Sequence, residues 1–305
     1  MMKANVVKEG ISFAKEVARE FHADDCLSMA AAIAYYTVFS LAPLLVIVIV
    51  VAGLFVSPEQ ASDAVHGQFA GLVGAAGADQ IRTMVEAVQA NPGGNVVARI
   101  LGVIAVLFGG TGVMLQLQMA LNRAWNVTPD PKRGGVRHFL MKRVLSLAMI
   151  LAIAFLLLVS LVVTALLSAV ASRASSLLPQ GMTWATAELV NFGVSLVVVT
   201  AMFTAIFKFM PEARIRWRDV AVGGFVTGLL FSLGKAAIGV YLGNSNVGSA
   251  YGTASSLAIV LVWVYYSAVI LLVGAEFTQV WTRRYGTGSH PVDGAVVAEA
   301  PPQAA

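Results

Sequence analysis

The residue types that most often carry catalysis or bind metals are few in this chain and are scattered along it. Cys26 is the only cysteine, and His22, His66, His138 and His290 fall in four different segments between apolar stretches. No histidine, cysteine or carboxylate group has the spacing of a metal site, and no glycine-rich loop with a lysine could cradle the phosphates of ATP. We therefore expect no enzyme activity and no catalytic, cofactor-binding or metal-binding residues.

The informative polar residues lie inside long apolar segments, where a polar group is costly unless it faces protein or water. Glu188, Asn191 and Ser195 share one helical face near the end of such a segment. Glu188 lies about 6 Å from that end, and Lys235 lies about 9 Å from the end of the next helix, at ~1.5 Å per residue. Because Glu188 and Lys235 can lie at matching depths in the membrane, an ion pair between them is favoured. The alternative is that Lys235 extends its ammonium group to the outer headgroups.

A second set of polar residues lies in the opposite half of the apolar segments. Thr111, Gln118 and Asn122 form a stripe on one predicted helix. Tyr36 and Ser40 share a face of an earlier predicted helix, and Pro43 follows them. Glu276 lies near the end of the last predicted helix. Pro43 removes a backbone hydrogen bond and can open the helix near Phe39. These groups either line a cavity or form hydrogen bonds that hold the helices together.

The composition places these residues in a membrane. Hydrophobic residues make up 58% of the 305 residues and charged residues only 12%, whereas soluble domains have about 25% charged residues. Stretches without any charge, such as the one between Asp25 and Glu59, are long enough to cross a bilayer core, which needs about 20 apolar residues. This excludes a soluble enzyme, a disordered chain and a disulfide scaffold.

We predict an all-α fold, a polytopic bundle of six transmembrane helices with an external helical hairpin. The predicted helices are 29–56, 96–121, 144–170, 184–209, 219–241 and 252–281, which together with the external loop 57–95 form one transmembrane domain over 29–281. Residues 1–28 form a cytoplasmic segment with an amphipathic helix over 5–22. Residues 282–305 form a cytoplasmic tail that we expect to be mostly disordered, because it is rich in glycine and proline and has no periodicity.

The basic residues set the orientation of the bundle. Of the 20 Lys and Arg residues, 16 lie in the four segments that the six-helix topology places on one side, and two lie on the other. The positive-inside rule therefore puts both termini in the cytoplasm. The basic residues are spread over short loops beside anionic headgroups, so we expect membrane lipids and not nucleic acid as partners.

Several motifs occur in the order found in one family. Residues 30–45 read AAAIAYYTVFSLAPLL and are similar to the first span of the YihY/BrkB family of bacterial inner-membrane proteins, with Ile33 in place of the usual leucine. The other matching motifs are Asn122-Arg123-Ala124-Trp125, Phe209-Met210-Pro211, Tyr251-Gly252-Thr253, Trp263-Val264-Tyr265-Tyr266 and Leu272-Val273-Gly274-Ala275-Glu276. The resemblance covers residues 20–285. It adds Tyr251, Gly252 and Trp263 to the candidate site residues.

The resemblance implies six spans but no settled activity. Some members are linked to virulence and serum resistance, and lipid or envelope-component transport has been suggested. An older label, ribonuclease BN, implies tRNA processing, which needs metal-binding carboxylates or an acid–base pair. The acids of the cytoplasmic loops, Asp130, Glu212 and Asp219, lie in separate segments, and this argues against a nuclease.

Two functions from different classes fit the sequence. The first is a transporter or a translocator of lipids or envelope components, without its own ATPase, acting on an envelope lipid or a small molecule. The second is a non-transporting envelope assembly or scaffold protein that binds partners through the external hairpin and the cytoplasmic loops. A membrane-associated ribonuclease ranks third. The sequence leaves open whether the chain forms a homo-oligomer.

The pairing of Glu188 with Lys235 predicts non-additive mutations. Lys235→Met or Glu188→Gln alone would leave the other charge buried and unpaired, at a cost of about 3–5 kcal/mol. The double variant should recover expression and thermal stability relative to either single variant. If Lys235 extends to the headgroups, Lys235→Met should be mild and the two effects should add; thermal unfolding of all four proteins in detergent decides between these outcomes.

Overall fold

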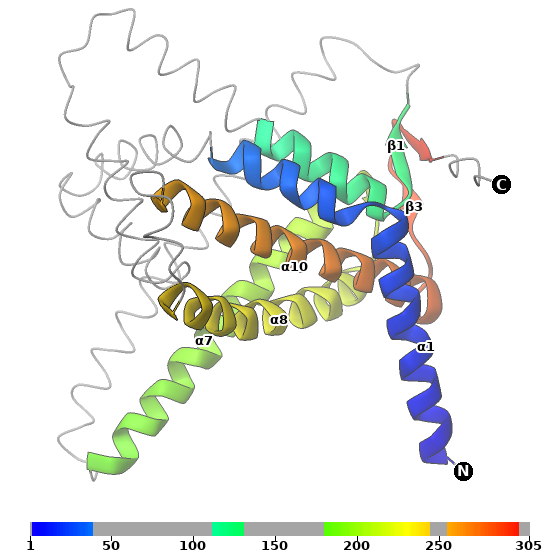
Figure 1. Ribbon diagram of the computed structural model, residues 1–305. Helices are drawn as coiled ribbons and strands as arrows, with labels where there is room; N and C mark the ends of the chain where they lie inside the picture. Colours follow the sequence, from blue (N-terminus) through cyan, green and yellow to red (C-terminus); the bar gives the residue numbers. More distant parts are fainter. Residues whose placement is uncertain (1, 39–111, 131–179, 245–254, 299–305) are drawn as a thin grey trace, which may run out of the picture. The chain divides into compact units, whose positions relative to one another are not determined.

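The computed structural model describes residues 2–38, 112–130, 180–244 and 255–298 (Figure 1). Within these ranges the chain is mostly helical. The helices are α1 (Met2–Ala23), Cys26–Val38, 112–124, α7 (Gln180–Phe209), α8 (Trp217–Asn244) and α10 (Ser255–Tyr285). The strands are β1 (Val127–Pro129), β2 (Ala213–Arg214), β3 (His290–Pro291) and β4 (Ala295–Val297). The chain divides into two compact units, Met1–Ala124 with Leu233–Glu276 and Trp125–Ser232 with Phe277–Ala305.

The long helices follow the predicted spans. Helices α7, α8 and α10 cover the predicted 184–209, 219–241 and 252–281, apart from a few terminal residues. The Cys26–Val38 helix covers the start of the first span and helix 112–124 the end of the second. The rest of these two spans, the span 144–170 and the hairpin in 57–95 lie outside the described residues.

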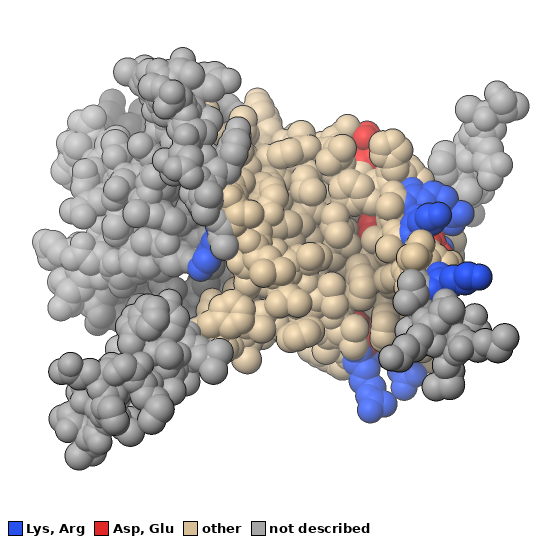
Figure 2. Space-filling view, turned by 60° about the horizontal axis from the view of Figure 1, so that its bottom comes forward, with Lys and Arg blue, Asp and Glu red and all other residues tan. Residues whose placement is uncertain are grey.

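Two of the described helices are long and apolar enough to cross a membrane. They are Phe192–Phe209, within α7, and Val260–Tyr285, within α10, each with a mean hydropathy of 2.0. Large apolar side chains such as Val197, Phe225 and Leu233 are exposed. Figure 2 shows the described surface as a wide tan expanse with few charged side chains. An apolar surface of this kind is typical of contact with lipid or with another protein.

Among the described residues, the first unit contains α1, the Cys26–Val38 helix, helix 112–124 and parts of α8 and α10. Helix α1 covers residues 5–22, for which an amphipathic helix is predicted, and its Phe21 packs against the core of this unit. A methyl group added at Gly112 would lie 3.1 Å from the ring of Tyr36, so these helices approach closely. A methyl group at Gly234 of α8 would lie 2.8 Å from Ile270 of α10.

In the second unit, small residues let α7 and α8 pack backbone against backbone. A methyl group on Gly224 would lie 2.8 Å from the backbone nitrogen of Thr204 and 3.0 Å from the carbonyl oxygen of Thr200, and one on Gly228 would lie 3.3 Å from the nitrogen of Thr200. The spacing of the two glycines is the small-xxx-small pattern of membrane helix packing. Phe203 and Phe231 fill the adjacent space, with ring centroids 5.7 Å apart.

The connections of the second unit are fixed by local chemistry. Helix α7 ends at Phe209 just before Pro211, which cannot continue a helix. The Lys208 ammonium group donates a hydrogen bond to the carbonyl oxygen of Ile215 and lies 5.4 Å from the Trp217 ring centroid. These two contacts tie the end of α7 to the start of α8.

The residues after α10 form two strands, and each pairs with a strand that is distant in the sequence. Strand β4 pairs antiparallel with β1, with Thr128 opposite Val296, and β3 pairs antiparallel with β2, with Arg214 opposite His290. Gly288 lies between α10 and β3, and Gly294 lies between β3 and β4; their φ angles of 77° and 99° favour glycine. The segment is thus held by backbone hydrogen bonds to β1 and β2.

Two expectations are therefore corrected. The disordered tail predicted for 282–305 is wrong over 282–298, because α10 continues to Tyr285 and two strands follow. The all-α class is incomplete, since the described residues include two two-stranded sheets. Strands of two or three residues are too short to show alternation of apolar and polar side chains, and their partners lie far away in the sequence.

The contact of α7 with α8 makes Gly224 intolerant of even a methyl group. We expect Gly224→Ala to destabilise the protein by about 1–3 kcal/mol, because backbone atoms of Thr200 and Thr204 would have to move. Gly193 of α7 is the matched control, because an added methyl group there meets nothing within 4 Å. Thermal unfolding in detergent should show a lower midpoint for Gly224→Ala than for the wild-type protein. The midpoint of Gly193→Ala should equal that of the wild type. Equal midpoints for the two variants would contradict this packing.

Candidate functional site

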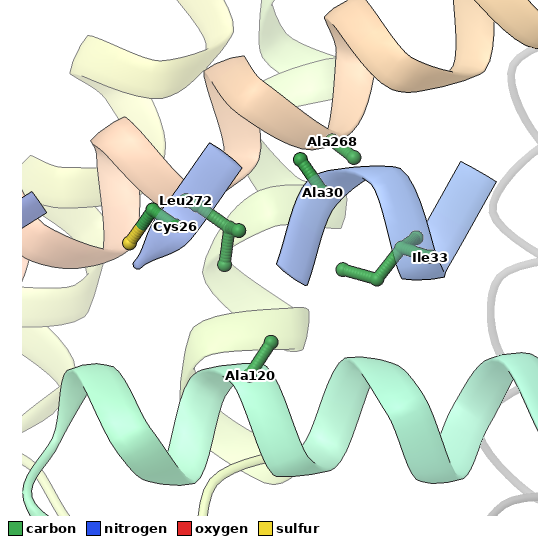
Figure 3. Close-up of a cluster of buried hydrophobic side chains, with 6 residues drawn as sticks. All are labelled: Cys26, Ala30, Ile33, Ala120, Ala268 and Leu272. Atoms are coloured by element: carbon green, nitrogen blue, oxygen red, sulfur yellow. The ribbon is translucent and has the colours of Figure 1, made fainter. Parts of the chain in front are cut away.

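The candidate site lies in the first unit, where three helices meet through small side chains. Cys26, Ala30 and Ile33 of the Cys26–Val38 helix face Ala120 of helix 112–124 and Ala268 and Leu272 of α10, and all six are buried. Figure 3 shows these side chains converging from the three helices. Three of the six are alanines, so the helix backbones come close together. This cluster fixes the ends of the helices that carry the polar groups.

A tight turn joins α1 to the Cys26–Val38 helix. Asp25 adopts a φ of 53°, a left-handed conformation that aspartate tolerates better than most residues. Its carbonyl oxygen accepts a hydrogen bond from the Met29 nitrogen at 3.2 Å, and its carboxylate accepts one from the Ser28 hydroxyl at 2.9 Å. The turn therefore ends α1, begins the next helix, and places Asp24 and Cys26 next to the core.

Glu276 is the centre of the site. It lies on α10 and is 1% exposed, although it is ionisable and sits in an apolar helix. Its Oε1 accepts a hydrogen bond from the Cys26 thiol at 3.5 Å, and its carboxyl group hydrogen-bonds with that of Asp24. Its Oε2 is buried without a hydrogen-bond partner among the described residues. Buried polar atoms are normally hydrogen-bonded, so this atom marks an unusual site.

One cation faces this group of acids. The Arg123 Nε lies 3.8 Å from the Asp24 Oδ1, with the Arg123 side chain 51% exposed and that of Asp24 16% exposed. Burial is the largest influence on Asp24 and raises the pKa of its carboxyl group above the usual range. The hydrogen bond with Glu276 and the charge of Arg123 lower that pKa, and the charge of Glu20 raises it. Burial outweighs the two lowering effects, so the pKa of Asp24 stays above its usual range.

Part of the predicted site lies within the first unit. Six predicted residues fall in the first unit: Tyr36 on the Cys26–Val38 helix, Gln118 and Asn122 on helix 112–124, Lys235 on α8, and Trp263 and Glu276 on α10. Gln118, Asn122 and Glu276 are buried, Lys235 and Trp263 are half-buried, and Tyr36 is exposed. Glu276 is thus the most deeply buried of the six.

The other predicted residues are not tested here. Ser40, Pro43, Tyr251 and Gly252 lie outside the described residues. Glu188 and Asn191 belong to α7, but their side chains lie outside the described part. The pairing of Glu188 with Lys235 remains a prediction.

Three residues of the site were missed from the sequence: Asp24, Cys26 and Arg123. Asp24 and Cys26 directly precede the first apolar segment, and Arg123 directly follows the second. Glu276 lies near the end of the last apolar segment on the same predicted side. A search for polar residues at helix ends that share one side would have found all four.

The arrangement can hold a proton or a polar group at the helix ends, and it does not resemble a metal centre. Within the described ranges, no three His, Cys, Asp or Glu side chains gather as metal ligands would. The acids have one half-exposed arginine as counter-charge. Their chemistry is that of proton exchange and hydrogen bonding.

Comparison with known proteins identifies the family. Residues 17–295 match the family described as "Virulence factor BrkB". The chain belongs to the BrkB family. The match includes α7, α8, α10 and the sheet of β2 and β3, and it ends at the first residue of β4 in this BrkB-family chain.

The relatives of this BrkB-family chain are named membrane proteins. The UPF0761 membrane protein of Alkalilimnicola ehrlichii is 31% identical over 279 residues, which cover 90% of this chain and 59% of that relative. Those of Pseudomonas paraeruginosa and Ralstonia nicotianae are 26% and 27% identical, covering 90% and 88% of this chain and 66% and 60% of each relative. The chain thus spans about three fifths to two thirds of the relatives' length. No solved structure matches it.

The small-residue cluster predicts a size limit at one position of this BrkB-family chain. Ala120 is fully buried against the other helices, whereas its neighbour Met119 is 64% exposed. Ala120→Leu should lower the free energy of unfolding by about 1–3 kcal/mol because the helices must separate. Met119→Leu should have little effect. Thermal unfolding of both variants in detergent checks this, and a tolerated Ala120→Leu would rule out the close approach of the three helices.

Proposed function

We propose that this BrkB-family protein is a six-span inner-membrane protein with both termini in the cytoplasm. We further propose that it moves a lipid or another envelope component, or a small molecule, across the membrane without hydrolysing ATP itself. The observation that carries the proposal is Glu276, a buried acid in a helix apolar enough to cross a membrane. Ionisable residues at such positions are costly and commonly serve the passage of polar groups.

Other polar residues of the first unit support a path for a polar headgroup. Gln118 and Asn122 are also buried and share a face of helix 112–124, and amide side chains can both donate and accept hydrogen bonds. Tyr36 lies on the adjacent Cys26–Val38 helix with an exposed ring. An opening between these helices would offer hydrogen bonds to a headgroup while the apolar outer surface remains in contact with lipid chains.

A second candidate function is an envelope assembly protein without transport activity. Strand β4 favours it, because Val296 and Val297 are 40% and 65% exposed on a short two-stranded sheet. Exposed apolar side chains on a strand can bind a partner by extending the sheet. A membrane nuclease has no supporting observation.

Reconstitution tests transport directly. Vesicles that contain the purified protein and fluorescent phospholipids, without ATP, should transfer the labelled lipid between leaflets faster than empty vesicles. Glu276→Gln and Gln118→Leu should slow this transfer by about tenfold or more, the effect of a ~1.4 kcal/mol change in barrier. Gly193→Ala is the matched control and should transfer lipid at the wild-type rate.

The same variants separate the two functions. Wild-type vesicles that move neither lipids nor a panel of small solutes, together with full cellular activity of Glu276→Gln, would contradict a transport function. If cells instead lose activity when Val297→Asp is introduced, the assembly function is favoured.

A further inference from the structure

Two carboxyl groups from opposite ends of the sequence meet at the turn after α1. Asp24 and Glu276 are 252 positions apart and hydrogen-bond with each other in the structure. An ionised carboxyl group only accepts hydrogen bonds. A hydrogen bond between the two therefore requires a proton on one of them.

The other groups around Glu276 do not replace this proton. The Cys26 thiol donates to Oε1, and Oε2 has no partner among the described residues. The Arg123 guanidinium lies beside Asp24 and is half exposed. Glu20, on the last turn of α1, adds a further negative charge to the group.

The charged and titratable groups that face the pair are thus known for every described element packed against it. Helix α1 contributes Glu20, the following turn contributes Asp24, the Cys26–Val38 helix contributes Cys26, and helix 112–124 contributes Arg123. Helix α1 also contributes Arg19, which is 73% exposed and pairs with Glu20 at 3.2 Å. With both carboxyl groups ionised, Asp24 and Glu276 would therefore share the half-exposed Arg123. Two carboxylates side by side in a buried site repel each other, so Asp24 and Glu276 together retain one proton.

We propose that Asp24 and Glu276 form a proton-binding site, in which one shared proton fastens the start of the first transmembrane helix to α10. Loss of the proton leaves two negative charges side by side. Their repulsion separates the turn at residues 24–26 from α10 and exposes Cys26. The site binds its proton whether or not the protein transports a cargo.

The sign of the pH dependence follows from linkage. Burial raises the pKa of Asp24 in the closed state, so the closed state binds a proton that the open state releases. The closed contact is fully stabilised below the ordinary carboxyl pKa of about 4 and weakens as the pH rises towards the raised value. Within that window, release of one proton makes opening about tenfold more favourable per pH unit.

Cys26 is a built-in probe for this opening, because it is the only cysteine and is fully buried. The full-length protein in lipid nanodiscs would be labelled with N-ethylmaleimide at a series of pH values. Thiolates react faster as the pH rises in any protein. The matched control is therefore the variant that carries Cys26→Ser and Ala31→Cys, because Ala31 is exposed on the same helix.

The ratio of the two labelling rates isolates the opening. In the wild-type protein the Cys26 rate divided by the control rate should rise by up to tenfold per pH unit and then level off. Glu276→Gln mimics the protonated acid and should keep the ratio low at every pH. Asp24→Asn should act in the same way. A ratio that does not change with pH, or a Glu276→Gln variant with the wild-type profile, would overturn the proposal.

A second measurement needs no variant at the site. Infrared spectra of the wild-type protein should contain the C=O stretch of a protonated carboxyl group at the pH values where the labelling ratio is low, and this band should disappear as the ratio rises. A band that is absent throughout, or that does not change as the ratio rises, would also overturn the proposal. Failure of lipid transfer in vesicles, with the band and the pH profile intact, would count against transport and leave the proton site in place.

Discussion

A carboxyl group buried in an apolar helix needs a hydrogen-bonding partner, and Glu276 imposes this requirement on the first unit. The cost of burying such a group unpaired reaches several kcal/mol. Asp24 and Cys26 meet the requirement from the turn at residues 24–26. The turn in turn depends on the left-handed conformation of Asp25. One acid on α10 thus determines where α1 ends and where the Cys26–Val38 helix begins.

The helices can satisfy this acid only because they approach closely. Alanines in the cluster of Figure 3 leave little side-chain volume between the backbones, and Gly224 and Gly228 do the same in the second unit. Apolar burial gives little drive for association inside lipid, so close van der Waals packing and hydrogen bonds take its place. Small residues and a few polar groups therefore share the role that a large hydrophobic core has in water.

The sequence was most informative where long apolar segments dominate. Helices α7, α8 and α10 were placed within a few residues, because charges and turn residues mark their ends. Glu276 was also identified, since an acid in an apolar segment is rare. Its partners Asp24 and Cys26 were not, because they lie on another segment and only the folded chain brings them together. The strands of 290–297 were missed for the same reason: two or three residues carry no periodic signal.

The pairing of β3 and β4 with β2 and β1 sets an order on biosynthesis. Chains emerge from the ribosome from the N-terminus at about 5–20 residues per second. Strand β1 at Val127–Pro129 is therefore made more than 160 residues before its partner β4 at Ala295–Val297. During that interval the backbone groups of β1 and β2 that later join the sheets have no strand to pair with. The second unit can close only after residues 290–297 have been synthesised.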